Sequence, residues 1–322
     1  MEINGDGARA ENQTRTNPYF EVLASGNFSP EKVSVAVEPY PKLSDELQKE
    51  VDDEWDKRNK DRVEKGEKTF KNDPQFILHE NPNIQNDTLD MRLYIGGFKL
   101  FIAAQNKEIA DKLPVKPGSL GTNIVLETAD NHLMIIQRDI NAPTKPGAMS
   151  VAGGYADFDK DLEENGERWN PFKTVKRELK EEAGVEEGDL NDVSSLGILY
   201  NKTVNNPTFA FLGRSNLTSD EIRSKNGTQE VDSDDNVKLR FIPNTQGEIE
   251  KMILWHAFSP SPSGAGTLAL YGKGKFGDEW FDRIQERLSY RERRLYGKLK
   301  DLPEDQVKSF ESRATERLLR QK

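Results

Sequence analysis

Residues 153–185 read GGYADFDKDLEENGERWNPFKTVKRELKEEAGV. In the second half of this stretch, Phe172, Val175 and Leu179 recur at helical spacing and form an apolar stripe that can pack on a sheet. Gly184 follows this stripe, and glycine is the residue that most often ends a helix. The stretch therefore predicts an amphipathic helix that docks on a sheet and ends at Gly184.

Three acidic residues share one side of this predicted helix. Glu178 and Glu182 are one turn apart, and Glu181 is also within helical reach of Glu178, so the three carboxylates can point the same way. Because like charges repel, such a concentration makes sense when a divalent cation neutralises it, and hard oxygen ligands suit Mg²⁺ or Mn²⁺. The alternative is a solvated acidic face in which Arg177 pairs with Glu181.

The surrounding pattern resembles the Nudix box, whose second half reads Arg-Glu-aliphatic-x-Glu-Glu-x-Gly-aliphatic. Residues 177–185 match this half in full. The first half is matched loosely: Gly153–Gly154 resembles its opening glycines, and Gly166–Glu167 resembles the Gly-Glu that enters the helix. Between them lies an extra acidic loop, residues 157–165, which we interpret as an insertion.

The resemblance to Nudix proteins implies a fold and a reaction. The implied fold class is α/β: a Nudix-type α/β/α sandwich with a mixed sheet, preceded by a smaller α+β N-terminal domain. The implied reaction is the Mg²⁺-dependent (or Mn²⁺-dependent) hydrolysis of the diphosphate bond in a nucleoside diphosphate linked to a group X. Its products are a nucleoside monophosphate and X-phosphate, so the expected partner is a small-molecule nucleotide.

The resemblance also implies roles for the residues of the box. Glu178, Glu181 and Glu182 would hold the metal. Arg177 would orient a neighbouring carboxylate rather than touch the substrate. The implied catalytic set is therefore Arg177, Glu178, Glu181 and Glu182.

Other candidate residues lie on the substrate side. Gly153 and Gly154 allow the backbone to come close to a ligand because they lack a β-carbon. Arg138 ends a predicted strand near the presumed site, where it could bind a substrate phosphate or pair with surface acids. Glu167 is a weaker candidate because of the insertion. Glu230 is another, since Nudix proteins often recruit an acid from a distant loop, although acidic clusters are usually solvated loops.

The identity of X depends on a second, looser resemblance. A strand, an acidic helix with Trp55, the run RLYIGGFKLFIAA and a Gly-led core resemble the UDP-glucose-hydrolysing branch of Nudix proteins over residues 30–285. This branch implies a nucleotide sugar such as UDP-glucose. ADP-ribose, ADP-sugars, dinucleotides and coenzyme A are alternative substrates. An alternative of another class is a non-catalytic Nudix module that binds a nucleotide without cleaving it.

Composition limits the partners of the chain. With 34% hydrophobic and 32% charged residues and no long apolar run, the sequence predicts no membrane span. A net charge of −10 repels phosphate backbones, so no nucleic-acid partner is expected. The chain has no cysteine, which excludes disulfides, thiolate zinc sites and a Cys nucleophile. Without a signal-peptide pattern, this composition predicts a cytoplasmic protein.

Breaks in the pattern divide the chain into four parts. These are a flexible N-terminus (1–30), an α+β N-terminal domain (31–117), a Nudix hydrolase domain (118–285) and a C-terminal helical extension (286–322). Apolar patterns predict strands at 33–37, 122–127, 132–137, 196–204, 208–213 and 252–258, and helices at 44–65 and 278–296. They also predict a hairpin that turns at Gly96–Gly97, a mostly polar loop at 214–250 and a linker at 259–266.

Overall fold

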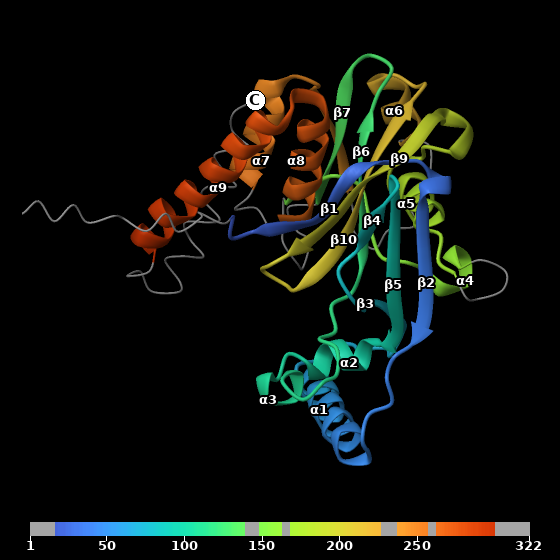
Figure 1. Cartoon of the computed structure of the whole chain (residues 1–322), viewed down its shortest axis with the longest axis vertical. Helices are drawn as coiled ribbons and strands as arrows, with labels where there is room; N and C mark the ends of the chain where they lie inside the picture. Colours follow the sequence, from blue (N-terminus) through green and yellow to red (C-terminus); the bar gives the residue numbers. More distant parts are fainter. Residues whose placement is uncertain (1–16, 139–147, 163–167, 227–236, 257–261, 300–322) are drawn as a thin grey trace, which may run out of the picture.

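The structure is a computed structural model that describes residues 17–138, 148–162, 168–226, 237–256 and 262–299. It is a mixed α/β fold with two sheets and helices on both faces of the larger one (Figure 1). This architecture confirms the predicted fold class. No helix within these ranges is long and apolar enough to cross a membrane.

The larger sheet has seven strands among the described residues, in the order β1-β9-β10-β6-β7-β11, with β8 paired to β7. The strands are β1 (Phe20–Phe28), β6 (Gly121–Glu127), β7 (His132–Arg138), β8 (Met149–Ser150), β9 (Leu190–Asn201), β10 (Asn206–Ser215) and β11 (Val237–Pro243). Strands β10 and β6 run parallel and the other pairs run antiparallel, so the sheet is mixed.

Alternating side chains of β10 separate the two faces of this sheet. Phe209 and Phe211 belong to the same buried cluster as Leu179 of α5 (Pro171–Ala183). Ala210 and Leu212 belong to the opposite cluster, which contains residues of three other helices. Those helices are α7 (Gln246–His256), α8 (Pro262–Phe276) and α9 (Asp278–Leu299), and Figure 1 shows them on the side of the sheet away from α5.

The smaller sheet follows the order β2-β5-β3, with β4 paired to β5. Its strands are β2 (Val33–Pro39), β3 (Pro74–Leu78), β4 (Asn83–Gln85) and β5 (Thr88–Gly97). Figure 1 shows three helices at the end of this sheet that points away from the larger sheet: α1 (Asp45–Glu64), α2 (Phe98–Ala103) and α3 (Lys107–Ala110). Because Leu89 and Leu93 of β5 share a buried cluster with Leu179, this sheet packs on the core that supports α5. The predicted division into domains remains a prediction.

Two predictions in the N-terminal third were wrong. Residues 20–28, within the segment predicted to be flexible, form β1 and pair with β9, and they bury Phe20, Ala24 and Phe28. Two register shifts against β9 break the alternation of apolar residues in this strand. The hairpin predicted at Gly96–Gly97 does not form either, because β5 ends at Gly97 and α2 begins at the next residue.

Further corrections concern the C-terminal half. Residues 252–256, predicted as a strand, continue the helix α7, in which Ile249, Met252 and Ile253 are buried at helical spacing. The predicted linker at 259–266 contains the start of α8 at Pro262, a residue that is well suited to a helix N-terminus. The polar stretch 214–250 contains α6 (Ser219–Asn226) and β11 as well as the start of α7.

The turn between β6 and β7 supports α6 through Asp130. Its carboxylate accepts hydrogen bonds from Thr128 Oγ1 (2.6 Å), Ser219 N (2.9 Å) and Ser219 Oγ (2.7 Å). These bonds hold the pKa of Asp130 well below its ordinary value of 3.8. The ionised carboxylate therefore joins the turn to the first residue of the helix.

Replacing Asp130 with Ala is expected to lower the free energy of unfolding by about 0.5–2 kcal/mol at pH 7, as for the loss of a helix cap. Because the folded-state pKa is lowered, this contribution is present above pH 3.8 and disappears as the pH falls through the folded-state value. Urea unfolding of both proteins between pH 7 and pH 3 measures the difference. The exposed acid Asp282 on α9 serves as the control, and its Ala variant should show no loss of stability at pH 7.

Candidate active site

Helix α5 begins and ends where its sequence dictates. The Asn170 side chain accepts a hydrogen bond from Phe172 N (3.0 Å), and Pro171 occupies the first helical position. At the other end, Gly184 adopts a left-handed φ of 68°, and its N–H donates to Lys180 O. Leu179 is fully buried against the sheet, whereas on the acidic side Glu178 is mostly buried and Glu181 is exposed.

The glycine pair lies directly against this acidic side. Gly153 N donates to Glu182 Oε2 at 3.0 Å. A β-carbon at Gly154 would lie 2.4 Å from Glu178 Oε1, so only glycine fits there without moving the carboxylate. Thr122 N of β6 donates to Gly154 O (2.8 Å), which ties the pair to the sheet. The backbone thus approaches two of the three predicted acids.

Arg177 lies among the acids and pairs with three carboxylates. Its Nη1 donates to Glu178 Oε1 (2.9 Å) and Glu181 Oε2 (2.8 Å). Its Nη2 donates to Asp161 Oδ2 (2.9 Å) and to Tyr155 O (2.9 Å). Burial alone would lower the pKa of Arg177, but the hydrogen bond to Asp161 and the charges of these acids raise it. The guanidinium is therefore a fixed positive charge at the centre of the cluster.

Negative charge exceeds positive charge around this guanidinium. Burial raises the pKa of Glu178, and the neighbouring charge of Glu181 raises it further, against the opposing effect of Arg177. Lys160 lies 3.8 Å from Glu181 but closer, at 3.1 Å, to Asp157. Among the described residues, four acids (Asp157, Asp161, Glu178 and Glu181) thus surround two cations (Arg177 and Lys160), an excess that a further cation would relieve.

The donor set suits Mg²⁺ in its chemistry, since every candidate ligand is a carboxylate oxygen. As the side chains lie, however, no three His, Cys, Asp or Glu residues of the described ranges converge to hold a metal ion. Two of the acids, Glu178 and Glu181, hydrogen-bond Arg177 instead. Because the guanidinium engages one oxygen of each, Oε1 of Glu178 and Oε2 of Glu181, these acids would bind a metal through their other oxygens.

The remaining predicted residues have different outcomes. Arg138 is the last residue of β7, where its backbone pairs with Val237, and its side chain lies outside what the structure describes. Glu167 and Glu230 lie outside the described residues. The sequence analysis missed Asp161, whose side chain is buried (2% exposed). Its carboxylate accepts hydrogen bonds from Arg177 Nη2 (2.9 Å) and from Thr174 Oγ1 (2.8 Å). The sequence signal that could have found Asp161 is the acidic loop 157–165. Because this loop was interpreted as an insertion, none of its acids was predicted to belong to the site.

Two cavities of the structure lie away from these acids. One of about 550 Å³ is next to the end of α8, and one of about 480 Å³ lies beside the start of α2. Neither is lined by an acid of α5. The candidate active site is thus a surface cluster at the glycine pair rather than one of these two cavities.

Gly153 has a φ of 155°, and a β-carbon there would lie 2.0 Å from Thr122 O. We therefore expect Gly153→Ala to lower the free energy of unfolding by more than about 1 kcal/mol, because alanine neither adopts this φ without strain nor fits the space. A β-carbon at Gly188 would have no neighbour within 4 Å, so Gly188→Ala is the matched control. Urea unfolding of both variants is the measurement, and equal stabilities would contradict the close approach at Gly153.

The comparisons with known proteins concern the fold. No family model matches the chain, and no curated protein matches it. Among solved structures, an ADP compounds hydrolase is similar at 18% identity and a TM-score of 0.33, over 48% of this chain and 74% of that one. The MutT protein from Methanosarcina mazei Go1 is similar at 14% identity and a TM-score of 0.26, over 52% and 92%.

A third similar structure is Tm1382, a candidate Nudix hydrolase, with 16% identity and a TM-score of 0.36 over 62% of this chain and 99% of that one. At such identities and TM-scores these three structures carry no argument about the activity of this chain. The function must therefore be argued from its own residues.

Proposed function

We propose that the chain is a Mg²⁺-dependent hydrolase of the diphosphate bond in nucleoside diphosphates linked to a group X. The observation that supports this best is the acidic side of α5. There Glu178 and Glu182 contact the segment of the glycine pair, and Glu178 and Glu181 share a single guanidinium. A helix built for stability alone would not place its negative charges this way.

In this proposal Glu178, Glu181 and Glu182 would hold Mg²⁺. The ion would offset the charge of the phosphate oxygens and lower the pKa of a bound water. Gly153 and Gly154 keep the strand exit close to the acids, because no side chain separates them.

Arg177 positions the acids rather than the substrate. It holds Glu178 and Glu181 on one side of the helix and joins them to the buried Asp161. The overall reaction consumes one water: its oxygen bonds to one phosphorus, and the bridging P–O bond breaks toward the other phosphate. A proton leaves the water, and the products are a nucleoside monophosphate and X-phosphate.

For X, we favour a sugar, with UDP-glucose as the first candidate. The support is the α+β segment between β1 and β6, because the order of its elements resembles the UDP-glucose-hydrolysing branch. ADP-ribose, ADP-sugars, dinucleoside polyphosphates and coenzyme A are the alternatives. An assay of purified full-length protein with each compound and Mg²⁺, followed by chromatography of the nucleotide products, tests the proposal. Mg²⁺-dependent monophosphate release supports it, and no release from any compound contradicts it.

A non-catalytic nucleotide-binding module is the second candidate. It is favoured by the spread of the acids: among the described residues, no three acidic or histidine side chains converge on one metal position. Calorimetric titration of the nucleotide panel, with and without Mg²⁺, separates the two functions. Tight binding without product release identifies a binding module, whereas release that rises with Mg²⁺ identifies a hydrolase.

A further inference from the structure

The cavity next to the end of α8 lies on the opposite face of the larger sheet from α5. It has a volume of about 550 Å³, which is in the range of small-molecule sites. Its floor includes Leu212 of β10, whose side chain belongs to the cluster under α8. Phe211, the neighbouring residue, points into the cluster of α5. The sheet therefore separates this cavity from the candidate active site.

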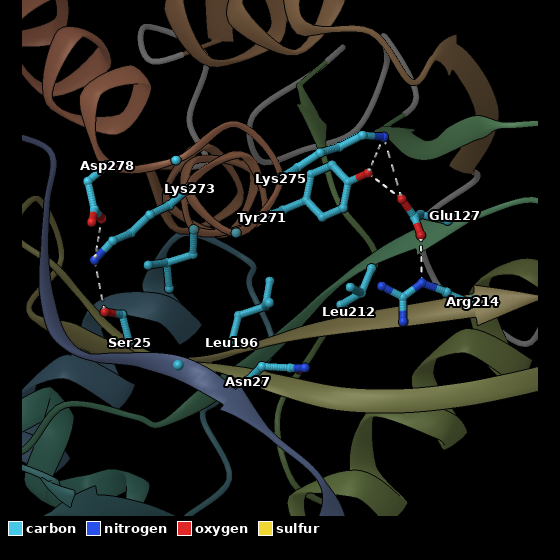
Figure 2. Close-up of a pocket in the computed structure, with 14 residues that line it drawn as sticks. Ser25, Asn27, Glu127, Leu196, Leu212, Arg214, Tyr271, Lys273, Lys275 and Asp278 are labelled. Atoms are coloured by element: carbon cyan, nitrogen blue, oxygen red, sulfur yellow. Dashed lines mark hydrogen bonds and ion pairs between the residues drawn. The ribbon is translucent and has the colours of Figure 1, made fainter. Parts of the chain in front are cut away.

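One end of the cavity is a network around Glu127, the last residue of β6 (Figure 2). Arg214 Nε donates to Glu127 Oε2 at 2.9 Å, and the Tyr271 hydroxyl donates to Oε1. Asn244 Nδ2 also donates to Oε1 (2.9 Å), and Lys275 Nζ lies 3.8 Å from it. Although burial alone would raise the pKa of Glu127, these partners lower it. The carboxylate is thus ionised, fully engaged and not available to a cationic ligand.

At the other end, Lys273 faces the cavity with weaker partners. Its Nζ donates to Ser25 Oγ at 3.2 Å and lies 3.5 Å from Asp278. The Asp278 side chain is 82% exposed, so this ion pair is screened by water and contributes little. Figure 2 shows Lys273 and Lys275 at opposite ends of the cavity, with Leu196 and Leu212 between them.

Charge and polarity together indicate the kind of ligand. The lining carries three cations (Arg214, Lys273 and Lys275) and two acids (Glu127 and Asp278), in a chain whose net charge is −10. Arg214 also pairs with Asp192 at 2.7 Å, so Lys273 is the cation whose acidic partner is most exposed. Between the cations the floor is apolar and buried. We propose that this cavity binds a small organic anion, a carboxylate or phosphate ester with an apolar body, independently of the acids on α5.

In this arrangement the anionic group pairs with the ammonium group of Lys273, whose partner Asp278 is screened by water. The apolar body of the ligand covers Leu196 and Leu212. A partly buried ammonium that already has a screened partner can accept a new anion at little cost in desolvation. Removing water from the leucines adds to the affinity. Inorganic phosphate alone lacks the apolar body and should bind weakly.

Anilinonaphthalene sulfonate, a fluorescent anion with an aromatic body, is the direct probe. We expect saturable fluorescence with the full-length protein. Affinity should fall roughly tenfold or more in the double variant Lys273→Gln/Lys275→Gln, the scale of one charge-assisted hydrogen bond. Lys251→Gln on α7, which removes an exposed lysine that does not line the cavity, is the matched control and should bind like the parent. Each single Gln variant gives a second test with less change to the fold, which thermal unfolding monitors.

Three competitors define the ligand class. Hexanoate and hexyl phosphate should displace the probe, and the stronger of the two identifies the preferred head group, whereas inorganic phosphate should not displace it at the same concentration. Equal probe affinity in the double variant, equal binding of the uncharged analogue phenylnaphthylamine, or displacement by inorganic phosphate as strong as by the hexyl compounds would each overturn the proposal. A Glu182→Gln variant should bind the probe normally, which keeps this test separate from the proposed hydrolase activity.

Discussion

Turnover is expected to fall at least ~100-fold when Glu182 is replaced with Gln, which is the scale of one catalytic group. Gln keeps the size of the side chain and an oxygen that can accept the hydrogen bond from Gly153 N, but it removes the charge that would attract Mg²⁺. The measurement is kcat at saturating Mg²⁺ with the best compound of the nucleotide panel. Because the fold should not change, unfolding curves of the parent and the variant are expected to overlap closely.

The control for this experiment is Glu187→Gln. Glu187 follows the same helix, but its side chain is 77% exposed and pairs with Lys176. It should keep the turnover of the parent enzyme. If Glu182→Gln keeps activity within a few-fold of the parent, the role of the acidic helix as a metal site is wrong, and hydrolysis must depend on other residues.

The second large effect concerns stability. Replacing Arg177 with Met is expected to lower the free energy of unfolding by about 3–5 kcal/mol, the usual result of removing one partner of a buried ion pair. Asp161, which is 2% exposed, would keep its charge without the guanidinium, and Glu178 would lose its only described cationic partner. Urea unfolding at neutral pH measures the loss.

A double-mutant cycle with Asp161→Asn identifies the cause. The double variant should lose less stability than the sum of the two single variants, because it leaves no unpaired charge between these two positions. Arg92→Met is the control, since Arg92 and its partner Glu80 are both more than half exposed and should contribute less than about 1 kcal/mol. Purely additive effects of Arg177→Met and Asp161→Asn would show that the two residues are not coupled.

Apolar patterns predicted amphipathic helices and short apolar strands. Helices α1 and α9 and strands β2, β6, β7 and β10 lie where alternating or helical apolar patterns placed them. The pattern failed for two helices, α7 and α8, that lack a clear polar side. In α8 ten residues are buried, so no polar side marks its period, and in α7 the run from Met252 to Leu254 has the composition of a strand.

The candidate site was predictable only as far as contacts are local in sequence. The one-turn spacing of Glu178 and Glu182 follows from the helix itself, and the structure brings both to the glycine pair. The partnership of Arg177 with Asp161 could not be predicted, because it depends on how the loop before the helix folds back. The catalytic roles of all these residues remain predictions.

Strand β1 carries a consequence for how the protein is made. It pairs with β9, so Phe20 meets Asn201, and α8 then packs on both strands. A nascent chain has to extend beyond Asn201 before β1 finds its partner β9, and such distant pairings slow folding. Until that point on the ribosome, an unpaired strand that carries Phe20 and Phe28 is open to association with other chains, a risk that a chaperone would reduce.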